Sequence, residues 1–160
     1  MSADARARLD ALDEKIIALL VRDGRAGYAA IGARVGLSAP AAKRRVDRLV
    51  GTGAITGFTA VIDQAVLGWS TEAYVELYCS GQPAPSLLAR SLAAIPEVVS
   101  ASTVTGDADT LLRVRAADVR HFERVLERLT ALPYVERTRT TLVLSPLFER
   151  PAPAAEPPTG

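Results

Sequence analysis

Residues 36–50 read GLSAPAAKRRVDRLV, and they are the most informative part of the sequence for the fold. Gly36 permits the positive φ angle with which helices commonly end, and Ser38 is a residue type that caps the first free N–H groups of a following helix. Pro40 falls in the first turn of that helix, where its missing N–H does no harm. The stretch therefore predicts a tight turn followed by a helix over Ala39–Gly51.

The predicted helix has one apolar stripe and one basic face. The stripe consists of Ala42, Val46, Leu49 and Val50. At about 100° per residue, Arg44 and Arg48 point almost directly away from this stripe, and Lys43 and Arg45 lie on its two flanks. Guanidinium groups on an outer face can pair with phosphates or with guanine edges, so this face suits DNA.

Two further helices are predicted before this one, over Leu9–Val21 and over 28–35, because their apolar residues recur at helical spacing. After it, the segment Ala54–Asp63 is rich in β-branched and aromatic residues, which predicts an extended hairpin or wing. Three helices, the turn and the wing together indicate a winged helix-turn-helix. The second helix of such a motif enters the major groove of DNA.

The second half of the chain has a different element order. Strands are predicted over Thr71–Cys79, Val98–Thr105, Thr110–Ala116 and Val135–Leu144, and helices over Pro85–Ile95 and Ala117–Leu132. This order is the ferredoxin-like βαββαβ arrangement. We therefore predict an α+β chain whose parts are a winged helix-turn-helix domain (1–53), a wing and hinge linker (54–69), a ferredoxin-like domain (70–149) and a Pro-rich disordered tail (150–160).

Composition excludes several classes of protein. The 160 residues include one cysteine, Cys79, and one histidine, His121, which leaves little for a disulfide, a metal site or histidine-based catalysis. No apolar run approaches the roughly 18 residues of a membrane-spanning helix, and the charged N-terminus is not a secretory signal. These features predict a cytosolic protein without metal, cofactor or membrane association.

Charge is distributed unevenly although the net charge is only +1. Residues 1–63 carry ten basic and seven acidic side chains, whereas the remaining residues carry nine and eleven. Between Arg25 and Arg48, six basic residues accompany a single acid, Asp47. Such asymmetry is typical of an anion-binding N-terminal part. A merely solvated basic face is the alternative, and it is less favoured because the turn, the cap and the outward arginines occur together.

The chain resembles the leucine-responsive and asparagine regulator family (Lrp/AsnC, feast/famine regulators) from Leu9 to about Leu147. Three segments carry the resemblance: LDALDEKIIALLVRDGRAGYAAIGARVGLSAPAAKRRVDRL at 9–49, GTGAITGFTAVIDQAVLG at 51–68 and VTGDADTLLRV at 104–114. No single match is decisive, but their order and spacing together are highly specific.

The resemblance implies a transcriptional regulator rather than an enzyme. It implies binding of double-stranded DNA through the N-terminal domain, and a C-terminal domain that senses a small molecule, commonly an amino acid, and drives assembly of homodimers into an octamer. The DNA-binding residues expected are Arg25, Ser38, Ala39, Pro40, Ala41, Lys43, Arg44, Arg45 and Arg48. The effector-binding residues expected are Thr103, Thr105, Gly106, Asp107, Ala108, Asp109 and Thr140.

Two positions depart from the family's pattern. Ala108 stands where the family often has an aromatic or large side chain, which leaves the identity of the effector open. Gly32 replaces the alanine usual in the middle helix, and glycine lowers helix propensity by about 1 kcal/mol. A further expectation concerns assembly: Tyr74 and Tyr78 share a face of the first predicted strand, and this face needs a cover, which predicts association.

Two other functions stay open at this point. One is an effector-independent architectural protein that wraps DNA as an octamer. The other is an enzyme, because sirohaem decarboxylases resemble the same two-domain architecture. Those enzymes rely on histidines and basic groups around a large tetrapyrrole, and this chain offers only His121. The enzyme is therefore the least favoured function.

Overall fold

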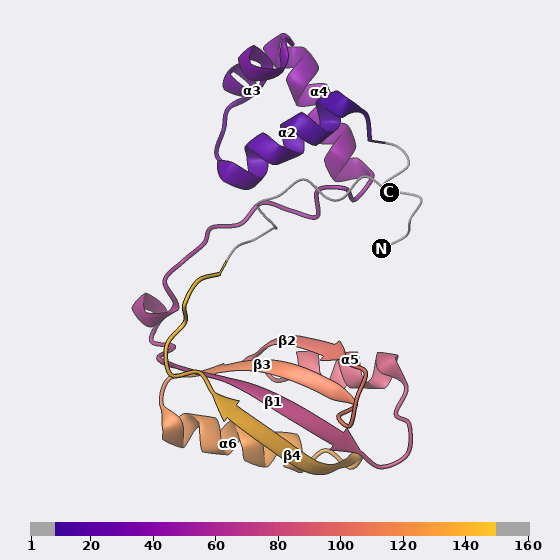
Figure 1. Cartoon of the computed structure of the whole chain (residues 1–160), viewed down its shortest axis with the longest axis vertical. Helices are drawn as coiled ribbons and strands as arrows, with labels where there is room; N and C mark the ends of the chain where they lie inside the picture. Colours follow the sequence, from indigo (N-terminus) through magenta and orange to yellow (C-terminus); the bar gives the residue numbers. More distant parts are fainter. Residues whose placement is uncertain (1–8, 150–160) are drawn as a thin grey trace. The chain divides into compact units, whose positions relative to one another are not determined.

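The computed structural model describes residues 9–149 (Figure 1). The chain forms two compact units, and the boundary between them falls between Val61 and Ile62. The predicted Pro-rich tail over 150–160 lies outside the described residues.

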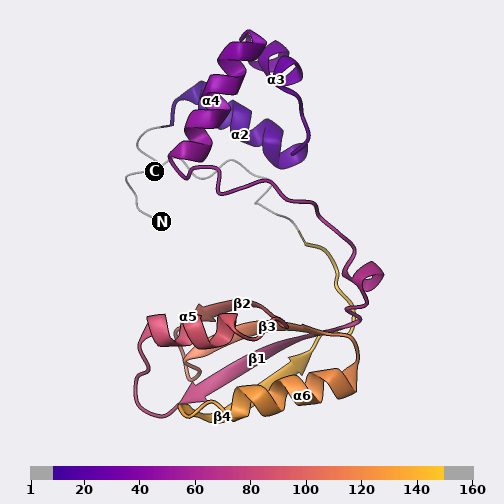
Figure 2. The same ribbon diagram turned by 180° about the vertical axis from the view of Figure 1, so that it is seen from behind.

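The N-terminal unit holds three helices, α2 (Ala11–Arg22), α3 (Tyr28–Val35) and α4 (Ala39–Gly51). Seen from behind, α4 is in front of α2, and α3 lies beside the start of α4 (Figure 2). Helices α3 and α4 have their predicted bounds. Helix α2 begins two residues later than predicted because the preceding residue, Asp10, acts as its cap.

A capping box begins α2. The Asp10 Oδ1 atom accepts hydrogen bonds from the backbone N–H groups of Leu12 at 3.0 Å and Asp13 at 2.8 Å. In return, Asp13 Oδ2 accepts the N–H of Asp10 at 3.1 Å. Three backbone donors that would lack partners at a helix start are satisfied in this way.

The turn between α3 and α4 has the predicted geometry. Gly36 ends α3 in the left-handed conformation, with a φ angle of 73°. Ser38 then caps α4, and its Oγ atom accepts the N–H of Ala41 at 3.4 Å. The helix-turn-helix predicted from these residues is confirmed.

The predicted wing is wrong. No strand occurs over 54–63 in the described chain. Ala54 and Ile55 pack against the core of the helical unit, whereas residues 56–63 are exposed. A strand needs a partner for its backbone groups, and a lone two-stranded hairpin is only marginally stable in water. The described residues of this unit contain no strand with which the segment could pair.

The core of the N-terminal unit consists of Ile16, Ile31, Ala42, Val46 and Leu49. Gly32 on α3 is also buried, because the backbone of the turn passes directly over it. A Cβ atom at Gly32 would overlap the carbonyl oxygen of Leu37. The turn therefore leaves no room for a side chain at position 32 of this chain.

We expect the substitution Gly32→Ala to destabilise the N-terminal unit by about 1–2 kcal/mol. The turn must shift to admit a methyl group, and overpacking of this kind typically costs about 1–3 kcal/mol, more than the roughly 1 kcal/mol that alanine contributes in helix propensity. Thermal unfolding followed by far-UV circular dichroism measures the change. Gly51→Ala is the control, because a Cβ there meets no atom. A Gly32→Ala protein as stable as the parent would contradict this account.

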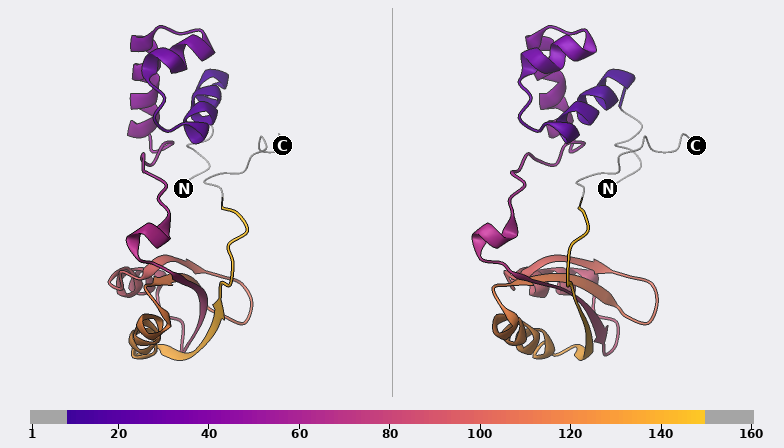
Figure 3. Two further views of the ribbon diagram at one scale, coloured as in Figure 1. Left: turned by 90° about the vertical axis from the view of Figure 1, so that its left-hand side faces the viewer. Right: turned by 60° about the vertical axis from the view of Figure 1, so that its left-hand side comes forward.

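The C-terminal unit holds β1 (Thr71–Cys79), α5 (Pro85–Ala93), β2 (Val98–Thr103), β3 (Thr110–Ala116), α6 (Val119–Thr130) and β4 (Val135–Leu142), after a short 3-10 helix, η1 (Gln64–Leu67). The strands form one antiparallel sheet in the order β2-β3-β1-β4. Both helices lie on the same face of this sheet (Figure 3). The ferredoxin-like prediction is confirmed. Among the described residues, no helix is long and apolar enough to cross a membrane.

The two faces of the sheet differ in character. The inner face packs on the helices through residues that include Val75, Leu77, Leu112, Val114, Leu92, Phe122, Val125 and Leu129. No helix of this unit covers the outer face (Figure 3). There, Glu72 contacts the Nε atoms of Arg113 at 3.0 Å and Arg115 at 2.7 Å. Partial burial acts to raise the pKa of Glu72, but the two guanidinium groups outweigh it and lower that pKa.

An ionic cluster joins the residue before β2 to helix α6. The carboxylate of Glu97, which is only 9% exposed, lies 2.8 Å from Nε2 of His121 and 2.6 Å from a guanidinium nitrogen of Arg128. Nδ1 of His121 accepts the N–H of Ala117 at 3.2 Å, which assigns the ring proton to Nε2 and directs it at Glu97. Burial acts to raise the pKa of Glu97, but Arg128 and His121 outweigh it and lower that pKa to about 2.

Candidate nucleic-acid interface and effector site

The start of α4 presents most of the predicted DNA-binding residues. Ser38, Ala39, Pro40 and Ala41 form its cap and first turn, and the exposed side chains of Lys43 and Arg44 follow. Arg25 is exposed in the loop between α2 and α3, where its backbone N–H donates to Asp23 Oδ1 at 2.9 Å. Among the described residues, Arg44 is the only cation of α4 without an ion pair.

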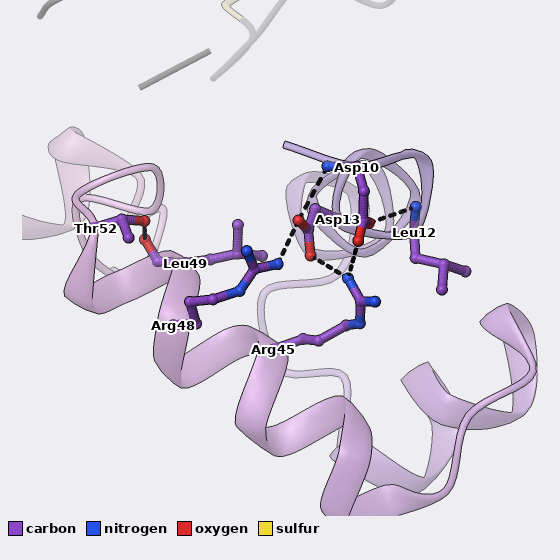
Figure 4. Close-up of polar contacts among 7 residues, drawn as sticks. All are labelled: Asp10, Leu12, Asp13, Arg45, Arg48, Leu49 and Thr52. Carbon is purple, nitrogen blue, oxygen red and sulfur yellow. Dashed lines mark hydrogen bonds and ion pairs between the residues drawn. The ribbon is translucent and has the colours of Figure 1, made fainter. Parts of the chain in front are cut away.

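Asp13 is the centre of an ionic network between α2 and α4 (Figure 4). Its side chain is fully buried. Oδ1 accepts a hydrogen bond from Arg45 at 2.8 Å, and Oδ2 accepts one from Arg48 at 2.5 Å. Arg45 also donates to Asp10 Oδ2 at 2.6 Å. Two arginines of α4 are therefore held by the carboxylates that begin α2.

The sequence predicts that Arg48 points away from the apolar stripe of α4, but its guanidinium group pairs with Asp13 on α2. Helical spacing gives the direction of the Arg48 Cβ atom correctly. The rest of this long side chain turns back to Asp13, and the side chain is 47% exposed. Arg45 is half-buried for the same reason. A buried carboxylate needs partners, and these two guanidinium groups are within reach. Burial acts to raise the pKa of Asp13, but its hydrogen bonds to Asp10, Arg48 and Arg45 prevail and lower it.

A second ion pair lies on the outer face of α4. Lys43 Nζ lies 2.6 Å from Asp47 Oδ2, four residues further along the helix, and 6.0 Å from the centre of the Tyr28 ring. Both partners are about half exposed. The hydrogen bond and the charge of Asp47 raise the pKa of Lys43. A phosphate group that approaches Lys43 must therefore compete with Asp47.

The turn between β2 and β3 is anchored to the end of β1 by Asp109. Its carboxylate accepts the backbone N–H of Cys79 at 2.7 Å, and its own N–H donates to the carbonyl oxygen of Leu77 at 3.0 Å. Gly106 has a φ angle of 120°, which disfavours any residue with a side chain. Asp109 therefore has a structural role in this turn, whereas Asp107 is exposed.

A shallow pocket of about 320 Å³ opens beside this turn on the outer face of the sheet. It is lined by Glu76, Tyr78, Val104, Thr105, Asp107, Ala108, Leu111 and Arg139. Three of these were predicted: Thr105, Asp107 and Ala108. The other predicted effector residues, Thr103, Gly106, Asp109 and Thr140, do not line it.

Sequence reasoning missed the strand residues of the pocket. The signal was available, because alternation along β1 places Glu76 and Tyr78 on the face opposite the core. Only the pairing register brings Leu111 and Arg139 to the two sides of Glu76. The Tyr78 hydroxyl donates to Glu76 at 2.8 Å, and the guanidinium group of Arg137 lies 3.6 Å from the centre of the Tyr78 ring.

The pocket contains charges of both signs. Arg139 lies 3.9 Å from Glu76, a loose pair, and its side chain is 70% exposed. Asp107 adds a second carboxylate at the rim, while Val104, Ala108 and Leu111 supply apolar surface. Such a site can hold an ammonium group, a carboxylate group and an apolar side chain at once. In the described part of the chain, no group of His, Cys, Asp and Glu side chains is arranged to hold a metal ion.

Both units of the chain match known domains. Residues 9–50 match the AsnC-type helix-turn-helix domain, and residues 72–153 match the Lrp/AsnC ligand binding domain. The HTH-type transcriptional regulator Rv2324 of Mycobacterium tuberculosis is 53% identical over 146 residues, which cover 91% of this chain and 99% of that protein.

Solved structures share this fold. The feast or famine regulatory protein Rv3291c of M. tuberculosis, complexed with L-methionine, is 33% identical with a TM-score of 0.82, covering 88% of this chain and 95% of that one. The transcriptional regulator NMB0573 of Neisseria meningitidis, also complexed with L-methionine, is 26% identical with a TM-score of 0.82, covering 89% and 94%.

These findings define a helix-turn-helix transcriptional regulator that binds DNA and carries a C-terminal ligand-binding domain. The chain belongs to the Lrp/AsnC family. The resemblance stated from the sequence and the α+β fold class are thereby confirmed.

Proposed function

We propose that this regulator contacts DNA through the start of α4 and senses an amino acid or a related metabolite in the pocket beside the β2–β3 turn. The observation that carries the proposal is the exposed pair Lys43 and Arg44 on α4, because Arg44 has no ion pair among the described residues. The proposed DNA contacts are Arg25, Ser38, Ala39, Pro40, Ala41, Lys43 and Arg44. Arg45 and Arg48 have another role in this proposal, because their ion pairs with Asp13 hold α4 on α2.

Arg44→Ala is expected to weaken DNA binding about tenfold, because one arginine contact to a base or phosphate is worth roughly 1–3 kcal/mol. The protein should remain folded, since Arg44 makes no ion pair among the described residues. Fluorescence anisotropy with the DNA upstream of this protein's own coding sequence measures the affinity. Arg124→Ala, an exposed arginine of α6, is the control. Equal affinities of the Arg44→Ala and parent proteins at low and moderate salt would exclude this residue as a contact.

Asp47→Asn is expected to strengthen DNA binding by about threefold to tenfold and to steepen its salt dependence by about one counterion. The substitution releases Lys43 from its partner at 2.6 Å and removes a negative charge from the outer face of α4. Affinities measured at four salt concentrations give the slope. The double variant Asp47→Asn/Lys43→Gln should lose the gain, and a gain that persisted there would mean that Lys43 does not reach a phosphate.

The pocket chemistry supports the sensing half of the proposal. Glu76 and Asp107 would accept hydrogen bonds from an α-ammonium group, Arg139 would pair with the α-carboxylate, and Val104 and Leu111 would contact an apolar side chain. Ala108 leaves more room than a large residue would. The two methionine complexes of structural relatives favour an amino acid.

Assembly belongs to the same proposal. The uncovered outer face of the sheet displays Tyr74, which is 41% exposed, beside Glu72 and the two arginines that pair with it. An uncovered sheet face with an exposed aromatic ring is suited to a second copy. We infer homodimers through this face, which associate to an octamer as the family resemblance implies.

One experiment tests regulation and sensing together. Anisotropy with the native upstream fragment and with a scrambled fragment of equal length is measured with and without a pool of amino acids. Specific binding that shifts with the pool supports both halves of the proposal. Specific binding without a shift contradicts the sensing half, and equal binding to both fragments favours an architectural protein. The sirohaem-decarboxylase alternative gains no support from His121, which is engaged with Glu97 and Ala117.

A further inference from the structure

A groove on the N-terminal unit is not used by the proposed function. It lies between α2 and the end of α3, with a volume of about 400 Å³, and is lined by Lys15, Ala18, Leu19, Arg22, Arg34 and Val35. Its four α2 residues are spaced by three and four positions, so they form one stripe along that helix. Leu19 and Val35 are half-buried and also pack against the core of the unit. The groove therefore has an apolar floor.

The rim of the groove carries uncompensated positive charge. Lys15, Arg22 and Arg34 have no ion pair in the part of the chain that the structure describes. On α4, by contrast, Lys43, Arg45 and Arg48 each have a carboxylate partner, and among the described residues of this helix only Arg44 does not. No carboxylate lines the groove. Three unneutralised cations around one hollow attract an anion.

The groove lies on the side of α2 that faces away from α4. At 100° per residue, the centre of its α2 stripe is roughly 170° around the helix axis from Asp13. Asp13 is the residue that contacts α4 through Arg45 and Arg48. DNA bound on the outer face of α4 therefore does not explain the charge of this groove.

We propose that the groove binds a small organic anion, whose carboxylate or phosphate head pairs with the three cations and whose short apolar body rests on the floor. The volume lies within the range of about 300–1,000 Å³ typical of small-molecule sites, and an apolar floor with a few charged groups is their usual lining. A bare phosphate or a DNA backbone would use the rim and leave the floor unused. The ligand binds the DNA-binding unit itself, separately from the pocket in the C-terminal unit.

Methyl-resolved NMR of the full chain tests the proposal, because Ala18, Leu19 and Val35 all carry methyl groups and the method tolerates a large assembly. The probes are octanoate and octyl phosphate, with octanol and inorganic phosphate as comparisons. We expect saturable shifts of these three methyl signals with the two amphiphilic anions, at lower concentrations than with either comparison compound. The Arg22→Gln/Arg34→Gln variant should bind about fivefold more weakly, since each exposed ion pair contributes little. The matched control, Arg120→Gln/Arg124→Gln on α6, should bind as the parent does.

Three results would overturn the proposal. Equal shifts with octanol would mean that the floor merely adsorbs apolar chains. Unchanged affinity in the Arg22→Gln/Arg34→Gln variant would show that the cations hold no ligand. If Arg22→Gln/Arg34→Gln reduced the salt dependence of DNA binding as much as Arg44→Ala does, the groove would be a contact for DNA phosphates.

Discussion

Asp13→Ala is expected to destabilise the N-terminal unit by about 3 kcal/mol, the lower end of the range for breaking a buried ion pair. The substitution removes the acceptor of Arg45 and Arg48 and the partner of the Asp10 N–H. The lower end applies because the Arg48 side chain is 47% exposed, and water can solvate the guanidinium group that is left behind. Only the backbone N–H of Asp10 and the half-buried guanidinium group of Arg45 lose a partner that water replaces poorly.

Chemical unfolding followed by far-UV circular dichroism measures this effect at fixed protein concentration. Glu14→Ala is the matched control, because Glu14 is the next residue of α2, is exposed and has no ion pair among the described residues. The single tryptophan, Trp69, belongs to the C-terminal unit, so its fluorescence transition should not move. Equal stabilities of the Asp13→Ala and Glu14→Ala proteins would show that the network contributes nothing.

The network also predicts how DNA binding responds to Asp13. Without the carboxylate, Arg48 loses its partner on α2 and Arg45 keeps only Asp10, so the position of α4 relative to the rest of the unit is less firmly fixed. A contact that specifies a base depends on that position, whereas attraction to phosphates does not. The Asp13→Ala protein should therefore lose discrimination between the native and scrambled fragments more than it loses affinity for DNA in general.

Local patterns were sufficient for most of the fold. Gly36 and Ser38 predict the turn and the cap because each acts on backbone groups within three residues of itself. Alternation along Thr71–Cys79 and the helical spacing of the apolar residues in α6 predict the layers of the C-terminal unit for the same reason. The strand order of the sheet then followed from the order of the elements.

The errors concern contacts between distant residues. The direction of Arg48 depends on Asp13, thirty-five positions away, and periodicity within α4 contains no information about it. The lack of room for a side chain at Gly32 is due to the carbonyl oxygen of Leu37, which lies above it only once the turn has formed. The strand residues of the effector pocket depend on the register of β1 with β3 and β4. The predicted wing does not form because a strand requires a partner strand, and the described residues of this unit supply none.

The two ionic networks perform the same task in the two units. Asp13 ties α2 to α4, and Glu97 ties the start of β2 to α6. Each is a carboxylate with little or no exposure that is held by two basic groups from another element. The proposed contacts with DNA and effector lie outside these networks, on exposed side chains such as Arg44 and Arg139. The chain therefore separates the charges that hold elements together from the charges that are available to ligands.

Glu97→Gln is expected to destabilise the C-terminal unit by about 3 kcal/mol at neutral pH. The pKa of Glu97 falls from its usual 4.5 to about 2 in the folded chain. At about 1.4 kcal/mol per pKa unit, this shift corresponds to roughly 3 kcal/mol of stability. The sign follows from proton binding: between the two values the unfolded chain binds more protons than the folded chain. The contribution of Glu97 is therefore complete above pH 4.5 and is lost as the pH falls through about 2.

The fluorescence of Trp69 reports this loss, because its ring lies 6.0 Å from the ring of His121, the partner of Glu97. The free energy of unfolding of the parent, measured with urea, should fall steeply as the pH falls below 4.5. That of the Glu97→Gln protein should be lower at neutral pH and should change less with pH. Part of the slope should persist, because the arginines beside Glu72 lower its pKa as well. Glu123→Gln, an exposed position on α6, should keep the full slope of the parent. If Glu97→Gln and Glu123→Gln gave the same pH profile, the carboxylate of Glu97 would not be the group whose protonation loosens α6 from the sheet.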